Sequence, residues 1–266
     1  MKKTLILTLT ILTLCTIRNK SLSQEKPDEM DTDRPNRTET PKTVKKGHFQ
    51  YETDLLLREN KTTGSDKEKD WLYNQANLKL GLFKNTDVQL IAQTYGKEST
   101  TEINTGITQS REGFGDIILR VKQNIKGNKQ GSFAVALVPY FKIPTSTFSD
   151  NQRYEGGLLL PMRVKLPGEW ELSFQVEADR LKDSEGEGMH TEFLQSINLN
   201  HDIVRKLKAF AETYYTFNFK DHHWNNFLDA ALQVEIKENF KIDGGFNYGI
   251  QKDAEKNVFL GAAFCF

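Results

Sequence analysis

The chain has 266 residues, enough for one large β domain or two smaller domains, and its 36 basic and 36 acidic residues give a formal net charge of zero. This balance argues against a general nucleic-acid-binding protein, which would need a basic excess. The mean hydropathy of −0.58 excludes a helical membrane protein, but it does not exclude a membrane β-barrel, whose lumen and loops are polar.

Residues 1–23 have the pattern of a secretory signal peptide. A short basic region precedes an apolar and threonine-containing run from Leu5 to Ile17, and small residues at Ser21 and Ser23 mark a cleavage site. The apolar run is too short to span a bilayer as a helix. The leucine before Cys15 is bulkier than a lipoprotein signal allows, which argues against a lipid anchor. The sequence therefore predicts an exported protein.

Residues 24–46, which we name the lead segment, are polar, contain three prolines and show no periodicity. We expect an extended segment rather than a folded unit, because its prolines prevent regular backbone pairing. Our hypothesis is that Asp33 and Arg34 pair with charged side chains of a lumen and narrow a pore. The alternative is a disordered periplasmic tether.

From residue 47 to residue 266, apolar and polar residues alternate with a period of two, which is the pattern of β-strands. The predicted strands are longer than the ~5–6 residues usual in soluble proteins and match the ~9–11 residues that a tilted strand needs to cross a bilayer. The alternation predicts twelve strands, near residues 47–58, 71–83, 87–96, 114–125, 132–143, 155–166, 169–179, 190–202, 206–217, 226–236, 239–250 and 257–266.

The connections between these strands alternate in length. Long polar stretches such as "ENKTTGSDKEKD" and "KESTTEINTGITQSRE" take turns with short ones such as "KNT" and "VRK". Outer-membrane barrels have long extracellular loops and short periplasmic turns. The sequence therefore predicts an all-β fold, an antiparallel up-and-down transmembrane barrel at residues 47–266, with both termini in the periplasm. A soluble exported β-sandwich or lipocalin-like barrel has the same periodicity and is the alternative.

The last predicted strand ends in "NVFLGAAFCF". An apolar strand needs a partner along both of its edges, and pairing with the first strand would close the cylinder. Gly261, Phe264 and Phe266 fit the C-terminal signal that barrel-assembly machinery reads, so this machinery and outer-membrane lipids are the expected partners.

The stretch "DTDRPNRTETPKTVKKGHFQYE" resembles the start of an outer-membrane transporter family labelled "putative meta-pathway of phenol degradation". The resemblance rests on Thr32 to Pro35, on a Thr-x-x-Pro-x-Thr-Val stretch that begins at Thr38, and on Gly47 before the first strand. "GFGDIILRVKQNI" and "FLDAALQVEIKENFKIDGGFNYGI" follow in the order that the family shows. The resemblance implies a membrane barrel with a transport role for small hydrophobic or aromatic compounds.

Charged residues on the polar face of the strands are the candidate lumen residues, and both signs are present in near balance. They can either form a mutually paired network or contribute to conduction. Together with the two lead-segment residues, the candidates for solute binding in the lumen are Asp33, Arg34, Arg120, Lys122, Arg163, Glu177, Asp179, Glu212, Asp229 and Glu235.

The sequence offers no catalytic, cofactor or metal site. His222 and His223 are adjacent and would point apart in an extended segment, so a polar outer loop is favoured over a metal site. A barrel hydrolase would need a His beside a Ser, and no His-x-Ser pair accompanies His190 or His201. We therefore expect an outer-membrane channel for a small solute, with a structural or adhesion barrel and a barrel hydrolase as the alternatives.

Overall fold

The computed structural model describes residues 30–128, 131–149, 151–183, 186 and 188–266. The predicted signal peptide and the first residues of the lead segment lie outside the described residues. Within the described part of the chain, no helix has the length and apolarity that a membrane crossing requires.

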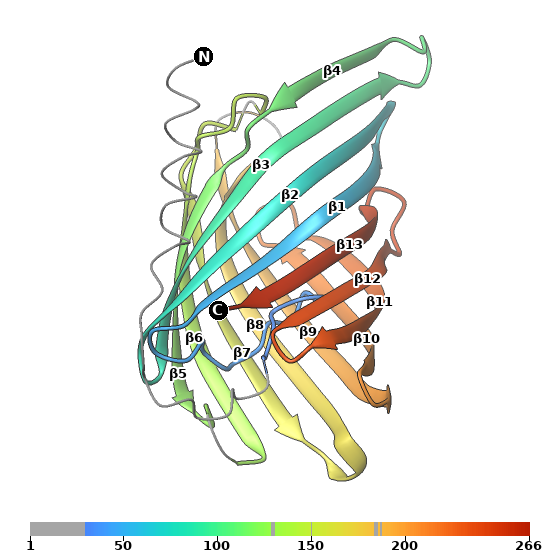
Figure 1. The fold of residues 1–266 in the computed structure, drawn as a ribbon. Helices are drawn as coiled ribbons and strands as arrows, with labels where there is room; N and C mark the ends of the chain where they lie inside the picture. Colours follow the sequence, from blue (N-terminus) through green and yellow to red (C-terminus); the bar gives the residue numbers. More distant parts are fainter. Residues whose placement is uncertain (1–29, 129–130, 150, 184–185, 187) are drawn as a thin grey trace, which may run out of the picture.

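In this described part of the chain, thirteen antiparallel strands form a single sheet (Figure 1). A three-residue turn of 3₁₀ helix, Pro167–Glu169, joins β7 to β8. The strands are β1 (Phe49–Thr63), β2 (Asp66–Phe83), β3 (Thr86–Glu102), β4 (Thr108–Gly113), β5 (Ile117–Lys126), β6 (Phe133–Ile143), β7 (Glu155–Lys165), β8 (Trp170–Lys182), β9 (Met189–Val204), β10 (Leu207–Asn218), β11 (His223–Lys237), β12 (Phe240–Gly249) and β13 (Lys256–Cys265).

The sheet closes on itself because β1 pairs with both β2 and β13, while β2 also pairs with β3. Among the described residues, the closed ring contains twelve strands, and β4 is an extra strand that pairs with the part of β3 from Gly96 to Thr101. The other part of β3, Thr86–Ala92, pairs with β5. The antiparallel barrel of about twelve strands that the sequence predicts is confirmed.

Two of the predicted long loops are instead strand extensions. The stretch "ENKTTGSDKEKD" continues β1 and β2 and leaves only Gly64 and Ser65 as the turn. The stretch "KESTTEINTGITQSRE" forms the end of β3 and β4 up to Glu112. Hydroxyl groups pair between Ser99 and Ser110 and between Thr101 and Thr108, each at 2.9 Å. Cross-strand hydroxyl pairs stabilise a hairpin without an apolar face, so a polar composition did not mean a loop here.

The orientation of the side chains separates a membrane barrel from a soluble one. On β5, Leu119 and Val121 are 46% and 42% exposed, whereas Lys122 and Asn124, which follow them on the other face of the strand, are 1% and 2% exposed. The same inversion holds on β11, where Leu228 is exposed and Asp229 is buried. A soluble barrel would bury its apolar residues, so the soluble alternative is wrong and the lipid-facing surface is apolar.

Candidate functional site

The described part of the lead segment, residues 30–46, lies inside the ring of strands (Figure 1). It is anchored at the end of the barrel that carries the short turns. There the Nζ atom of Lys241 donates to the carbonyl oxygen of Met30 at 2.7 Å, and Lys46 forms a bridge with Gly81 of β2. The residues between these anchors rise into the lumen and return, so the lead segment forms a loop within the barrel.

Asp33 lies at the centre of a buried ion cluster. Its carboxylate contacts the ammonium groups of Lys79 and Lys122, and the Lys79 ammonium also contacts Glu52. Glu52 in turn accepts hydrogen bonds from the backbone N–H groups of Asp33 and Arg34 at 3.1 Å. Burial acts to raise the pKa of Asp33, which belongs to none of the membrane-spanning strands, but Lys122 and Lys79 outweigh it and lower the pKa to about 2.

Arg34 reaches the adjacent part of the lumen wall, formed by β1, β13 and β12. Its Nη1 atom lies 2.6 Å from Asp54 of β1 and its Nη2 atom lies 2.7 Å from Asp243 of β12. The guanidinium carbon sits 5.6 Å from the ring centroid of Phe259, a cation–π geometry. A Cβ atom at Gly261 would lie 2.0 Å from Arg34 Nη2. Only glycine at position 261 leaves room for this ion pair.

The next turn of the lead segment binds the wall formed by β8 and β10. Glu212 accepts hydrogen bonds from the backbone N–H groups of Arg37 at 2.7 Å and Thr38 at 2.8 Å. The Arg37 side chain lies 3.2 Å from Glu177. Glu39 contacts Arg120 of β5. The lead segment is therefore held from several sides of the lumen at once.

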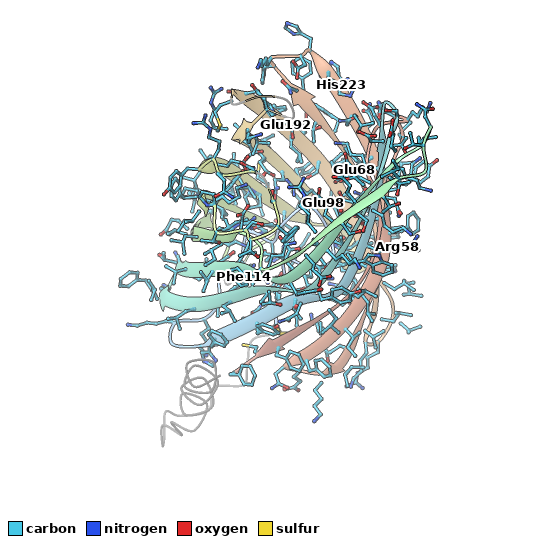
Figure 2. All side chains as sticks on the ribbon, turned by 90° about the horizontal axis from the view of Figure 1, so that it is seen from above. Arg58, Glu68, Glu98, Phe114, Glu192 and His223 are labelled. Atoms are coloured by element: carbon cyan, nitrogen blue, oxygen red, sulfur yellow. The ribbon has the colours of Figure 1, made fainter. Side chains whose placement is uncertain are left out.

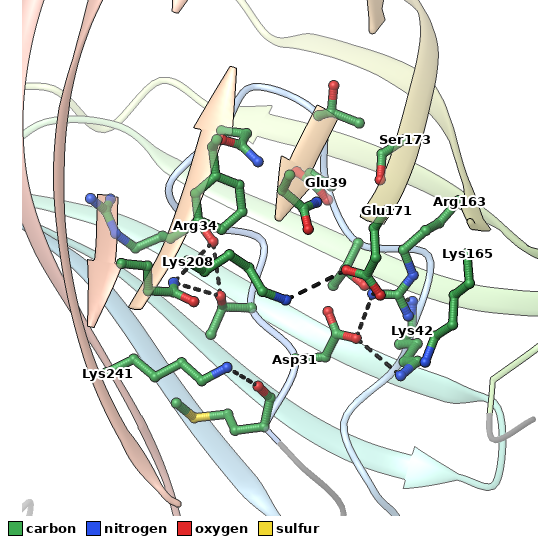
Figure 3. Close-up of a pocket in the computed structure, with 18 residues that line it drawn as sticks. Asp31, Arg34, Glu39, Lys42, Arg163, Lys165, Glu171, Ser173, Lys208 and Lys241 are labelled. Atoms are coloured by element: carbon green, nitrogen blue, oxygen red, sulfur yellow. Dashed lines mark hydrogen bonds and ion pairs between the residues drawn. The ribbon is translucent and has the colours of Figure 1, made fainter. Parts of the chain in front are cut away.

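A small inner cavity lies below the lead segment, toward the short turns, and has a volume of about 80 Å³ (Figure 3). Its wall is rich in cations, which include Lys165, Lys208 and Lys241. Arg163 also lines the cavity, and its Nη1 atom lies 2.8 Å from the carboxylate of Asp31 in the lead segment. The cations of the inner cavity are thus largely engaged by neighbouring carboxylates and carbonyl groups.

A larger outer cavity lies on the other side of the lead segment, toward the long hairpins, and has a volume of about 400 Å³. Arg34 and Arg37 lie at its floor, and its wall carries carboxylates, including Glu59, Asp229 and Glu255. Apolar side chains complete the wall. Seven carboxylate and two guanidinium side chains line the outer cavity: Asp33, Glu39, Glu52, Asp54, Glu59, Asp229 and Glu255, with Arg34 and Arg37.

Seven of the ten residues expected in the lumen site contact or belong to the seated lead segment. They are Asp33, Arg34, Arg120, Lys122, Arg163, Glu177 and Glu212. Two others lie in the lumen without touching it: Asp179 accepts a hydrogen bond from the Tyr140 hydroxyl at 2.7 Å, and Asp229 lines the outer cavity. Glu235 does not join the site, because it lies beside the β9–β10 turn, where its backbone N–H donates to the carbonyl oxygen of Lys206.

Sequence reasoning missed Glu52, Asp54 and Asp87 as partners of the lead segment. The signal was present in β1, where Gln50, Glu52 and Asp54 recur with a period of two and mark an inward polar stripe. Asp87 accepts a hydrogen bond from the backbone N–H of Val44 at 2.9 Å. It is a single acid beside a short turn, so no pattern singled it out.

The C-terminal strand closes the barrel through backbone pairing. Phe266 donates its backbone N–H to the carbonyl oxygen of Phe49 at 2.8 Å and accepts a hydrogen bond from the Phe49 N–H at 3.1 Å. Phe264 stacks on Phe240 with ring centroids 4.3 Å apart. Of the three residues expected to form an assembly signal, Gly261 lies against Arg34 in the lumen, whereas Phe264 and Phe266 pack where β13 meets its neighbouring strands.

The histidines near the long hairpins lie apart from the lumen site. His223, at the start of β11 (Figure 2), has its Nε2 atom 3.2 Å from Asp253. Among the described residues, no group of three or more His, Cys, Asp or Glu side chains could hold a metal ion. Also at this end of the barrel, a hydrogen bond from Lys220 lowers the pKa of Asp183 below its ordinary value.

The sequence from residue 32 to residue 266 matches the family described as "Putative MetA-pathway of phenol degradation". The fold is similar to the COG4313 outer membrane channel from Pseudomonas putida F1, with a TM-score of 0.67 and 11% identity over 85% of this chain and 97% of that chain. It is also similar to the NanC porin, with a TM-score of 0.53 and 12% identity over 80% of this chain and 98% of that one. The KdgM porin, solved in complex with disordered oligogalacturonate, has a TM-score of 0.51 and 7% identity, with coverage of 82% and 99%. Identities this low show a shared fold and nothing finer. The comparison with curated proteins gives no match.

Proposed function

The chain belongs to the family described as "Putative MetA-pathway of phenol degradation", and from this premise we propose that it is an outer-membrane channel for the uptake of small hydrophobic or aromatic solutes. In this proposal the long hairpins face the outside, both termini face the periplasm, and the barrel-assembly machinery inserts the chain by reading Gly261, Phe264 and Phe266. The proposal assigns the protein no catalytic role.

One observation carries the proposal: the lead segment is seated inside the lumen between the inner and outer cavities. A barrel with only a structural role has no need for a loop that divides its interior. The pairing of Asp33 with Lys79 and Lys122 favours a fixed constriction, because buried charges that are paired and hydrogen-bonded hold one arrangement. Twelve strands also give a narrower bore than the 16–18 strands of general porins.

The test is the single-channel conductance of the refolded protein with Asp33→Ala and Arg34→Ala combined. Loss of both side chains removes the ion pairs with Lys79, Lys122, Asp54 and Asp243, so the lead segment should loosen and the conductance should rise. The matched control combines Asp221→Ala with Arg205→Ala, which removes one charge of each sign from exposed positions. An unchanged conductance in a correctly assembled double variant would contradict the constriction and leave the lead segment as a tether.

The projecting hairpins support a second candidate function, an adhesion platform. The β3–β4 hairpin extends past the part of β3 that pairs with β5, and Figure 2 shows Glu68 and Glu98 on the extended strands. A barrel of this kind would show no solute-dependent current in either the native or the double-variant form.

A further inference from the structure

Several buried hydrogen-bond acceptors in the outer cavity have no donor. Asp229 is 8% exposed and Asn247 is 6% exposed, and both line the cavity. Among the described residues, the Oδ1 atoms of Asp229, Asn247 and Asn257 have no hydrogen-bond partner. The amide nitrogen of Asn247 is already used, since it donates to the Tyr214 hydroxyl at 2.7 Å. Buried acceptors without donors are costly, so the site favours a molecule that brings donors.

The same wall carries carboxyl groups that have no cationic partner among the described residues. Asp229, Glu59 and Glu255 form no ion pair with a described residue, and Lys61 acts on Glu59 only at longer range. The Glu59 and Glu255 carboxyl groups lie within hydrogen-bond reach of each other, so they share a proton and carry at most one negative charge between them. The two guanidinium groups at the floor are already engaged, Arg34 by Asp54 and Asp243 and Arg37 by Glu177. The free positions of the outer cavity therefore favour a cation.

The cavity suits an organic cation better than a metal ion. Its volume of about 400 Å³ falls within the range of ~300–1,000 Å³ typical of small-molecule sites. Leu57, Leu72 and Phe259 add an apolar and aromatic surface to its wall, which an aquated metal ion would not use. The carboxylates are spread around the wall, and no described group of three or more could bind one ion.

We propose that the outer cavity is a binding site for a small organic cation, in which an ammonium group lies against the cross-strand row formed by Asp229, Asn247, Asn257 and Glu59, while a hydrocarbon body packs on Phe259 and the leucines. This inference rests on the proposed channel function and names its solute class. A charge-assisted hydrogen bond is stronger than a neutral one, so the positive charge of the ammonium group should decide the affinity.

The test is calorimetric titration of the full refolded protein in detergent micelles with three probes of similar size: 2-phenylethylammonium, 2-phenylethanol and phenylacetate. We expect the ammonium probe to bind the native protein about tenfold or more tightly than the alcohol, and the carboxylate to bind least, because only the first supplies a charged donor. Asp229→Asn should lower the affinity for the ammonium probe about tenfold and leave binding of the alcohol unchanged.

Two controls keep the result interpretable. Asp221→Asn removes an exposed carboxylate at the same end of the barrel, and it should bind the ammonium probe as the native protein does. Glu255 lies in the connection between β12 and β13, outside the barrel strands. If Asp229→Asn fails to fold, Glu255→Gln should show the same loss of affinity for the ammonium probe. Heat-modifiable migration on a detergent gel reports the folded barrel for each variant.

Equal affinity for the ammonium probe and the alcohol, or native affinity in a folded Asp229→Asn or Glu255→Gln variant, would overturn the proposed site and leave a cavity that only water fills. Conductance of the same preparations separates this outcome from failure of the channel. A protein that conducts without discriminating between the probes refutes the cation site alone. A protein that binds the ammonium probe but never conducts refutes the channel and keeps the site.

Discussion

The side chains that hold the lead segment and those that line the outer cavity are of the same kinds, but they differ in whether their charges are paired. At the seat, Asp33 is matched by Lys79 and Lys122, and Arg34 by Asp54 and Asp243. In the outer cavity, Asp229 has a carboxylate oxygen without a partner among the described residues. Charges that are fully paired within the chain fix a structure, whereas charges left unpaired at a cavity are available to a ligand.

Lys79→Met should have the largest effect of the variants that disrupt the paired charges around the lead segment. The Lys79 side chain is 2% exposed and bridges Asp33 and Glu52. Removal of one partner from a buried ion pair leaves uncompensated charge and costs about 3–5 kcal/mol. We expect a fall of this size in the free energy of unfolding, measured by guanidinium titration in micelles.

Lys67→Met is the control for that loss, because Lys67 lies on the same strand at an exposed position of the projecting hairpin. It should change stability by less than about 0.5 kcal/mol. If the two methionine variants were equally stable, the ion cluster would contribute nothing to the seat.

Gly261→Ala tests whether the fit of Arg34 depends on space rather than on charge. The new Cβ atom would meet Arg34 Nη2 at 2.0 Å, so the guanidinium group must move away from Asp243. Overpacking of this kind costs about 1–3 kcal/mol, and the conductance should rise because the lead segment shifts.

The matched variant is Gly244→Ala on the neighbouring strand β12, where the nearest atom to a new Cβ lies at 3.3 Å. It should leave the conductance near its native value. Equal behaviour of the two alanine variants would show that Arg34 does not need the glycine.

Arg37→Ala should have the smallest effect on the free energy of unfolding. It compares a solvent-exposed ion pair of the lead segment with the buried ones. The Arg37 side chain is 48% exposed although its partner Glu177 is 4% exposed, and ion pairs that solvent screens contribute only about 0–1 kcal/mol. A double-mutant cycle with Glu177→Gln measures the coupling free energy. A coupling free energy of about 3–5 kcal/mol, the size expected for a buried ion pair, would instead place Arg37 among the buried contacts that hold the lead segment.

The barrel could be predicted from the sequence because its signal is local. Alternation on β5 and β11 shows which side chains face the lipid and which face the lumen, and the length of the strands matches the bilayer. The ends of β1, β2 and β3 could not be placed in the same way. Beyond the membrane both faces of a hairpin meet water, so "ENKTTGSDKEKD" has no apolar face to reveal its strands.

The lumen site could be predicted only in part, for a related reason. The sequence indicates that Arg120, Lys122 and Glu212 point inward, but which charges meet depends on the strand register and on the path of the lead segment. Asp229 and Glu177 look alike in the sequence, as inward acids on long strands. Only the fold shows that Glu177 has an arginine beside it and that Asp229 faces the open cavity.

The partners of Arg34 that lie far along the chain also determine when the lead segment can reach its final position during folding. Asp54 follows Arg34 closely in the chain, but Asp243 lies 209 residues further along, and Gly261 comes later still. An early part of the chain is therefore among the last to reach its final position, since its seat does not exist until β12 and β13 have arrived. Until then the ring is unfinished and the lead segment stays accessible to a protease, so protection of the Arg37–Thr38 bond from trypsin would report the completion of the barrel.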